Sequence, residues 1–147
     1  MDPSERNVAV LRSAIQEWNA GNLQGYLALY DPEAVLQGYA GVELDLTGIR
    51  QFYELFWTAF PGSRLVCEDV FASGAKVACR FVLSGKHRGE FQGVPPSGRD
   101  IALPGITILE FQSGRCVRRW SYTDGVGLLQ QIGALPMPDA RDRRPRG

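Results

Sequence analysis

Histidine is nearly absent from this chain, because its 147 residues contain only His87. Cysteine is scarce as well, and the three cysteines show no Cys-x-x-Cys spacing. Zinc and non-haem iron are held mainly by histidine and cysteine side chains, so we expect no metal site. An odd number of cysteines inside strand-like segments indicates small buried side chains in a reducing compartment rather than disulfides.

Long apolar runs are also missing. No segment approaches the roughly 18 apolar residues of a membrane-spanning helix, and the polar start Met-Asp-Pro-Ser-Glu-Arg does not resemble a signal peptide. We therefore expect a cytoplasmic protein with no membrane partner. The net charge is zero, and residues 137–147 carry +2, which leaves −2 for the rest. A slightly acidic folded part argues against a nucleic-acid partner.

The length suits one domain with its own core. We expect residues 1–136 to form that domain and the basic end, 137–147, to be a solvated tail. The first 60 residues show helical periodicity. They predict three helices, over 3–19, 22–30 and 48–60, the first capped by Asp2 and the third by Thr47.

Beyond residue 61 the apolar period changes from 3.6 to two. This pattern predicts strands over 65–72, 75–91 with a break, 99–111 and 116–123, after a short strand at 34–37. A short helix over 126–132 would end at Gly133. Three helices followed by a long-stranded, mostly antiparallel sheet predict an α+β fold, and a strongly curved sheet can leave a hollow against the helices.

The segment that ends at Asp124 carries the main candidate site. Simple alternation along the strand puts Cys116, Trp120, Tyr122 and Asp124 on one face. A carboxylate at the wet end of an apolar pocket has a raised pKa and can move protons. Asp124 also precedes the last predicted helix, and an N-cap carboxylate that accepts backbone N–H bonds is a poor base. The sequence leaves both readings open.

Two further residues are candidates for polar roles. His87 lies between two nearby glycines, and the missing side chains would leave room for a ligand beside it. Arg80 interrupts an apolar run and would be a buried cation if it faced inward. It would then either form a structural ion pair, with Glu68 or Glu110, or clamp an anionic group of a substrate.

Aromatic side chains on the predicted helices are expected to form the core, since stripes at helical spacing usually serve packing. Three of them are also candidates for ligand contact: Trp18, Tyr30 and Trp57.

Five short motifs occur in order along the second half of the chain. They are Phe60-Pro61, His87-x-Gly89-x-Phe91-x-Gly93, Gly93-Val-Pro-Pro-Ser-Gly98, Trp120-x-x-x-Asp124 and Gly127-Leu-Leu-Gln-Gln-Ile-Gly133. Through them the chain resembles the SnoaL-like polyketide cyclases (ester cyclases) of the NTF2-like superfamily, over roughly residues 8–136.

The resemblance implies a cone-shaped α+β barrel, in which three N-terminal helices pack on a curved, mostly antiparallel sheet and a short helix follows. It implies a cofactor-independent, aldol-type ring closure of a polyketide or similar carbonyl ester. Asp124 would be the acid/base, and His87 a pocket residue and the second catalytic candidate. Trp120 and Tyr122 would contact the substrate. The partner would be a small hydrophobic carbonyl compound, and the protein would form a homodimer or higher homo-oligomer.

Two positions depart from the pattern of this family. Gln37 stands where such proteins often carry a pocket His or Asn, and Glu110 stands where some carry a further polar catalytic partner. Other functions therefore stay open: a ketosteroid-isomerase-like isomerase using Tyr122, an epoxide hydrolase using Asp124 with Arg80, and a non-catalytic binding or dimerisation module.

Overall fold

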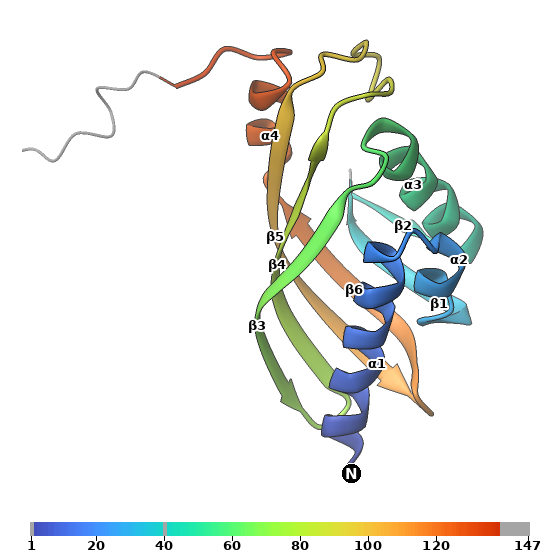
Figure 1. The fold of residues 1–147 in the computed structure, drawn as a ribbon. Coiled ribbons are helices and arrows are strands. Elements are labelled where there is room, and N and C mark those ends of the chain that lie inside the picture. The colour runs from blue at the N-terminus through green and yellow to red at the C-terminus, as the bar shows by residue number, and fades with distance from the viewer. Residues whose placement is uncertain (1, 40, 139–147) are drawn as a thin grey trace, which may run out of the picture.

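The computed structural model describes residues 2–39 and 41–138. A curved six-stranded sheet of order β2-β1-β6-β5-β4-β3 has three helices packed on one side (Figure 1). Neighbouring strands are antiparallel except β1 and β6. The elements are α1 (Pro3–Asn19), α2 (Leu23–Leu27), β1 (Tyr30–Tyr39), β2 (Val42–Leu44), α3 (Leu46–Ala59), β3 (Arg64–Ser73), β4 (Lys76–Lys86), β5 (Asp100–Gln112), β6 (Arg115–Thr123) and α4 (Gly125–Gln131).

The predicted α+β architecture is confirmed, and so are its main elements. The strand predicted over 75–91 ends at Lys86, and β2 was not predicted. Of the predicted tail over 137–147, residues 139–147 lie outside the described residues. Within the described ranges, no helix is long and apolar enough to cross a membrane. The core fills the space between the sheet and helices α1 to α3, and its fully buried side chains include Leu11, Tyr26, Leu36, Ile49, Phe60 and Leu109.

Side-chain caps fix where the helices begin. Asp2 accepts a hydrogen bond from the Glu5 amide at 2.8 Å, as predicted. The cap of α3 is Asp45 rather than Thr47, because the Asp45 carboxylate accepts from the Gly48 amide at 2.9 Å. α3 therefore starts at Leu46, two residues earlier than predicted.

The second helix is shorter than predicted. α2 ends at Leu27, and Tyr30 already belongs to β1. Pro32 therefore lies inside a strand, although proline lacks the amide that a strand needs. It is tolerated because the pairing of β1 with β6 is irregular between Tyr30 and Val35.

A bulge in β6 decides which of its side chains face the helices. Phe111 of β5 pairs with Cys116, whereas the preceding Glu110 pairs with Arg118, so β6 contains one extra residue here. One extra residue reverses the alternation beyond it. Arg119 is consequently buried, and Trp120 faces outward. The prediction that Cys116 shares a face with the aromatics after it is wrong for this reason.

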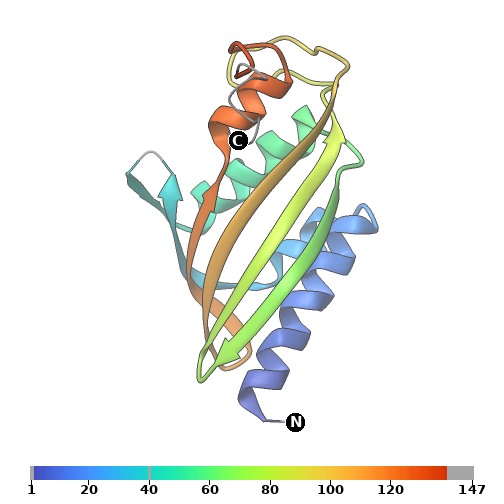
Figure 2. The same cartoon turned by 90° about the vertical axis from the view of Figure 1, so that its left-hand side faces the viewer.

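The last helix, α4, lies beside β5 where β6 ends, and one of its side chains bonds to the free edge of β5. The side-chain amide of Gln131 pairs with both the N–H and the C=O of Ala102 in β5, at 2.7 and 2.9 Å. It thus replaces the strand neighbour that β5 lacks beyond Gly105. Gly133 follows α4 at φ +86°, the left-handed conformation predicted for this position. Figure 2 shows α4 at the end of β6; within residues 2–39 and 41–138, no other helix lies on the outer side of the sheet.

Candidate ligand-binding site

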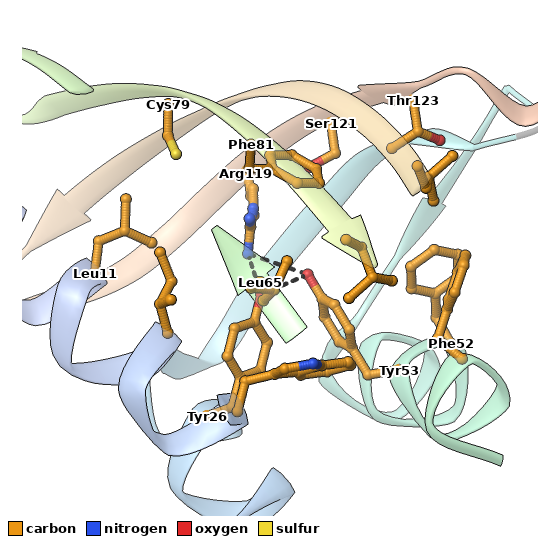
Figure 3. Close-up of a pocket in the computed structure, with 15 residues that line it drawn as sticks. Leu11, Tyr26, Phe52, Tyr53, Leu65, Cys79, Phe81, Arg119, Ser121 and Thr123 are labelled. Atoms are coloured by element: carbon orange, nitrogen blue, oxygen red, sulfur yellow. Dashed lines mark hydrogen bonds between the residues drawn. The ribbon is translucent and has the colours of Figure 1, made fainter. Parts of the chain in front are cut away.

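A small cavity lies between the sheet and helices α1 to α3 (Figure 3). Its volume is about 50 Å³, which is room for roughly four water molecules. Most of its walls are apolar or aromatic, and polar atoms come from few side chains. The lining residues are Leu11, Ile15, Trp18, Tyr26, Phe52, Tyr53, Phe56, Leu65, Cys79, Phe81, Leu83, Leu103, Arg119, Ser121 and Thr123.

Arg119 is the only cation among these lining residues, and only 6% of its surface is exposed. Its Nε donates to Thr107 Oγ1 at 2.9 Å. Its Nη1 donates to the hydroxyl oxygens of Tyr26, Tyr30 and Tyr53 at 2.7, 2.8 and 3.1 Å. Figure 3 shows the guanidinium reaching from the sheet toward the phenols of Tyr26 and Tyr53. No ion pair joins Arg119 to a carboxylate within residues 2–39 and 41–138.

The three phenols that surround the guanidinium come from three different elements. Tyr26 lies in α2, Tyr30 opens β1 and Tyr53 lies on the buried side of α3. Tyr26 donates to the Tyr53 hydroxyl at 3.1 Å, and the hydroxyls of Tyr30 and Tyr53 are 2.7 Å apart. The rings of Tyr26 and Tyr53 also meet edge to face at 4.9 Å. The packing of the helices on the sheet therefore assembles the cluster.

Burial controls the charges in this cluster. Burial by itself lowers the pKa of Arg119, but the nearby tyrosines and the Cys116 thiol hold that pKa well above its usual range. Burial raises the pKa of Tyr30 well above its usual range, although the positive charge of Arg119 opposes the effect. At neutral pH the site thus consists of a charged guanidinium among neutral phenols. A buried charge without a counter-charge is costly, and an anionic ligand would relieve that cost.

One nitrogen of the guanidinium remains for such a ligand. Nε and Nη1 of Arg119 are engaged, whereas Nη2 makes no hydrogen bond to any residue that the structure describes. Thr107 cannot take part as a donor, since its hydroxyl donates to the Trp120 carbonyl at 2.8 Å. Ser121, which is 2.8 Å from Thr107 and also lines the cavity, therefore donates to Thr107.

The cavity walls provide no conventional base. Among the described residues that line the cavity there is no carboxylate and no imidazole. Thr107 and Ser121 face each other across β5 and β6 near Arg119, but hydroxyls are poor proton acceptors at neutral pH. The arrangement can bind and stabilise negative charge, and it cannot remove a proton through a nearby carboxylate. In the same described ranges, no group of three or more His, Cys, Asp or Glu side chains could hold a metal ion.

Asp124 lies at the N-terminus of α4 and is exposed. Its Oδ1 accepts a hydrogen bond from the Gly127 amide at 2.9 Å. A Cβ on residue 127 would lie only 2.1 Å from the other carboxylate oxygen, so the carboxylate rests directly against Gly127. Asp124 does not line the cavity. Of the two readings of this residue, the geometry is that of the helix cap.

His87 is fully buried and anchors the connection between β4 and β5. Its Nδ1 accepts from the Ser97 amide at 3.1 Å and lies 2.9 Å from the Ser97 hydroxyl. The space that we expected beside it is filled by protein, because a Cβ on Gly89 would be 2.3 Å from the Thr58 carbonyl oxygen. Gly85 and Gly89 thus admit the end of α3 rather than a ligand, and His87 does not line the cavity.

Arg80 is an exposed residue on the outer side of the sheet. It pairs with Asp69 at 2.6 Å and with Glu68 at 3.4 Å. These contacts raise the pKa of Arg80, chiefly through the hydrogen bond to Asp69. The condition for a buried cation is not met, because Ala78, Arg80 and Val82 share the outward face of β4. Of the two roles considered for Arg80, the structural ion pair is present, with Glu68 as predicted and with Asp69 in place of Glu110. Among the described residues that line the cavity, the cation is Arg119 instead.

Trp120 and Tyr122 also lie on the outer side. Lys76 and Arg118 approach the Trp120 ring, at 5.4 and 5.9 Å from its centroid. Tyr122 is 65% exposed. Neither lines the cavity, so neither meets a ligand bound there.

Gln37 and Glu110 are likewise away from the cavity. Gln37 donates to the Glu43 carboxylate at 2.5 Å on the β1–β2 hairpin. Glu110 is paired across the sheet with Lys76 and Arg118, on the outer side.

The three aromatic candidates on the side of the sheet that faces the helices differ in whether they line the cavity. Trp18 lines the cavity, and its indole N–H donates to Ser63 at 3.2 Å. Tyr30 does not line it but belongs to the Arg119 cluster. Trp57 packs edge to face on Trp18 at 4.9 Å and stays outside the lining.

The fold and the cavity together define a class of small α+β proteins with an apolar chamber between a curved sheet and three helices. The family model of the SnoaL-like polyketide cyclases matches residues 8–132, and the chain belongs to that family.

Three relatives illustrate the range of the similarity. Aklanonic acid methyl ester cyclase AcmA of Streptomyces galilaeus is 29% identical over 94% of this chain and 97% of its own. AclR of the same organism, to which a hydroxylase activity is ascribed, is 25% identical with a TM-score of 0.88, over 95% of this chain and 88% of its own. IdmH of Streptomyces antibioticus, with an ascribed polyketide cyclase activity, is 29% identical with a TM-score of 0.75, over 86% of this chain and 98% of its own.

Proposed function

We propose that this protein binds an enolisable carbonyl compound in the cavity and that Arg119 stabilises its enolate as the first step of an aldol-type ring closure. The observation that carries the proposal is a buried guanidinium with a free Nη2 and no carboxylate partner among the described residues. Membership of the SnoaL-like polyketide cyclase family and the similarity to a methyl ester cyclase support the reaction type.

Electrostatic stabilisation would supply most of the rate enhancement. A fixed donor in a dry, apolar site is worth far more than the same donor in water. The enolate oxygen would accept from Arg119 Nη2, while the hydroxyls of Tyr26 and Tyr53 keep the guanidinium in place. Because it is already positioned, the site pays no reorganisation cost when the negative charge develops.

The protons in the reaction balance without an oxidant or a cofactor. The α-carbon of the substrate loses a proton to water, and its electron pair becomes the enolate. The enolate carbon then forms a bond to a second carbonyl carbon of the same molecule, and the resulting alkoxide recovers a proton. A neutral phenol of the cluster, Tyr26 or Tyr53, is a donor within the cavity for that step. The phenolate that remains regains a proton from the hydronium formed when water took the α-proton, which restores the phenol.

A carboxylate mechanism with Asp124 as acid/base is the competing proposal. It would require Asp124 to leave its bond to Gly127. The two can be separated by measuring the turnover of aklanonic acid methyl ester, the compound for which the relative AcmA is named. We expect Arg119→Met to lower kcat/KM by about 100-fold or more and Asp124→Asn to leave it within about threefold. A full loss in Asp124→Asn with an active Arg119→Met would refute the Arg119 mechanism.

The lack of a conventional base favours one second candidate. With no carboxylate or imidazole in the described lining, the protein would bind enols or phenolates without converting them. Arg119-dependent binding of a 1,3-diketone without any turnover of carbonyl esters would identify this binding module.

We also propose that the protein is a cytoplasmic homodimer. The three cysteines are odd in number and lack Cys-x-x-Cys spacing, a pattern typical of buried thiols in a reducing compartment. Exposed apolar residues on the outer side of the sheet, Phe71, Ile106 and Tyr122, offer a surface for a second copy. Light scattering should give twice the monomer mass for wild type and the monomer mass for Ile106→Asp. A wild-type protein with the monomer mass would contradict the dimer.

A further inference from the structure

The cavity at Arg119 is too small to hold a polycyclic ligand. Its volume of about 50 Å³ admits a group of only a few non-hydrogen atoms, since one water already needs roughly 10–15 Å³ of such space. A 1,3-dicarbonyl unit fits this description, whereas an aromatic ring system does not. The rest of a polyketide ligand must therefore lie elsewhere.

A second, larger hollow adjoins the cavity. Its volume is about 440 Å³, and its lining residues belong to α3 and to the segment after β4. That segment lies beside the end of α3 (Figure 1), where Arg88 and Gly89 donate to the Ala59 carbonyl. Phe52 and Phe56 line both spaces. These two half-buried rings are 5.0 Å apart and are thus the partition between the spaces.

We propose that this outer hollow binds the neutral aromatic body of the ligand, while the enolised head reaches past Phe52 and Phe56 to Arg119. The inference rests on the proposed function, because it takes the ligand head to be held by Arg119. It adds a second subsite and a route of entry.

Aromatic and aliphatic side chains give the outer hollow its preference for flat apolar groups. Phe91 is buried and packs on Phe56 at 5.4 Å, which forms a firm inner wall. Leu55, on the solvent side of α3, is 65% exposed and lines only this hollow. An exposed leucine beside an apolar hollow offers area that a ligand ring can bury.

A tight turn forms the opposite edge of the hollow. Phe91 and Val94 exchange backbone hydrogen bonds at 3.0 and 2.8 Å, and Gln92 and Gly93 between them both have positive φ. This pre-formed edge needs no ordering when a ligand binds, which favours affinity.

The charges of the two spaces set the orientation of the ligand. Arg119 lines the inner end, and Glu90 is the acidic residue among those that line the outer hollow. An anionic group is attracted inward and repelled at the outer end. The ligand class is therefore an acidic 1,3-dicarbonyl head joined to an uncharged aromatic body.

Two probes separate the subsites: acetylacetone, which is a head alone, and naphthoylacetone, which adds a naphthalene ring. Their affinities can be measured by ligand-observed NMR and calorimetry for wild type, Leu55→Asp and Arg119→Met. Val126→Asp is the matched control, since Val126 is 61% exposed on α4 and lines neither space.

We expect naphthoylacetone to bind about tenfold or more tightly than acetylacetone. Leu55→Asp should weaken naphthoylacetone about tenfold, leave acetylacetone unchanged and preserve the fold, whereas Val126→Asp should change neither affinity. Equal binding of naphthoylacetone to wild type and Leu55→Asp, with the dependence on Arg119 intact, would overturn the outer subsite alone. Binding of both probes that does not depend on Arg119 would instead overturn the proposed function.

Discussion

Replacing Arg119 by methionine should separate stability from binding. The change removes four hydrogen bonds, one to Thr107 and three to the tyrosines. It leaves no acceptor stranded, because the phenols remain bonded to one another and Thr107 keeps the Trp120 carbonyl and Ser121. It also abolishes the cost of burying a charge.

The magnitudes favour a stable variant. Hydrogen bonds to charged groups contribute about 1.5–3 kcal/mol each, but replacement of buried charges by apolar groups of similar volume is often neutral or stabilising by about 1–4 kcal/mol. We therefore expect the free energy of unfolding of Arg119→Met to lie within about 1 kcal/mol of wild type, or above it. The affinity for a 1,3-diketone should fall, because loss of a buried charge partner costs about 2–5 kcal/mol, or roughly 30-fold to 5000-fold.

Urea unfolding followed by tryptophan fluorescence measures the first quantity, and calorimetric titration measures the second. Arg118→Met is the matched control, since Arg118 is the sequence neighbour of Arg119 but faces outward beside Trp120. Both quantities should be unchanged in that variant. If Arg119→Met loses more than about 3 kcal/mol of stability but keeps its affinity, Arg119 is a structural residue and the reasoning fails.

Three other changes test separate parts of the account. Gly105→Ala places a Cβ 2.5 Å from the Phe81 ring. The ring should move into the cavity and lower the affinity for acetylacetone about tenfold. An unchanged affinity would contradict the position of Phe81 in the cavity wall. Asp124→Ala should lower the unfolding free energy by about 1 kcal/mol through loss of the cap and leave affinity intact; reduced affinity would bring Asp124 into the site. Burial raises the pKa of the Cys116 thiol from 9.0 to about 11, so stability present below pH 9 should be lost as pH rises to about 11. This loss, about 3 kcal/mol, should disappear in urea titrations of Cys116→Ala; an identical loss in the variant would exclude the thiol.

The sequence predicted the elements well because their signals are local. The capping pattern after Asp2 and the left-handed glycine at 133 each depend on a few neighbouring residues, and both appear in the structure. The cap of α3 was assigned to Thr47 instead of Asp45 because two good capping residues stand close together.

The candidate site was harder to predict because it depends on register. A bulge after Cys116 reverses the faces of β6, and nothing local in the sequence marks it. One signal was available: Arg118 and Arg119 are adjacent in a strand, so one of them had to face inward. The tyrosines that accept hydrogen bonds from Arg119 are far apart in the sequence, and only the packing of the helices on the sheet brings them together.

The most direct test of the central claim is the pKa of bound acetylacetone, followed by the absorbance of its enolate in a pH titration with saturating protein. If Arg119 stabilises the enolate, the ligand should ionise at a lower pH when bound to wild type than when free, and the shift should vanish in Arg119→Met. A bound ligand that ionises at the same pH as free acetylacetone, or at a higher pH, would contradict the account.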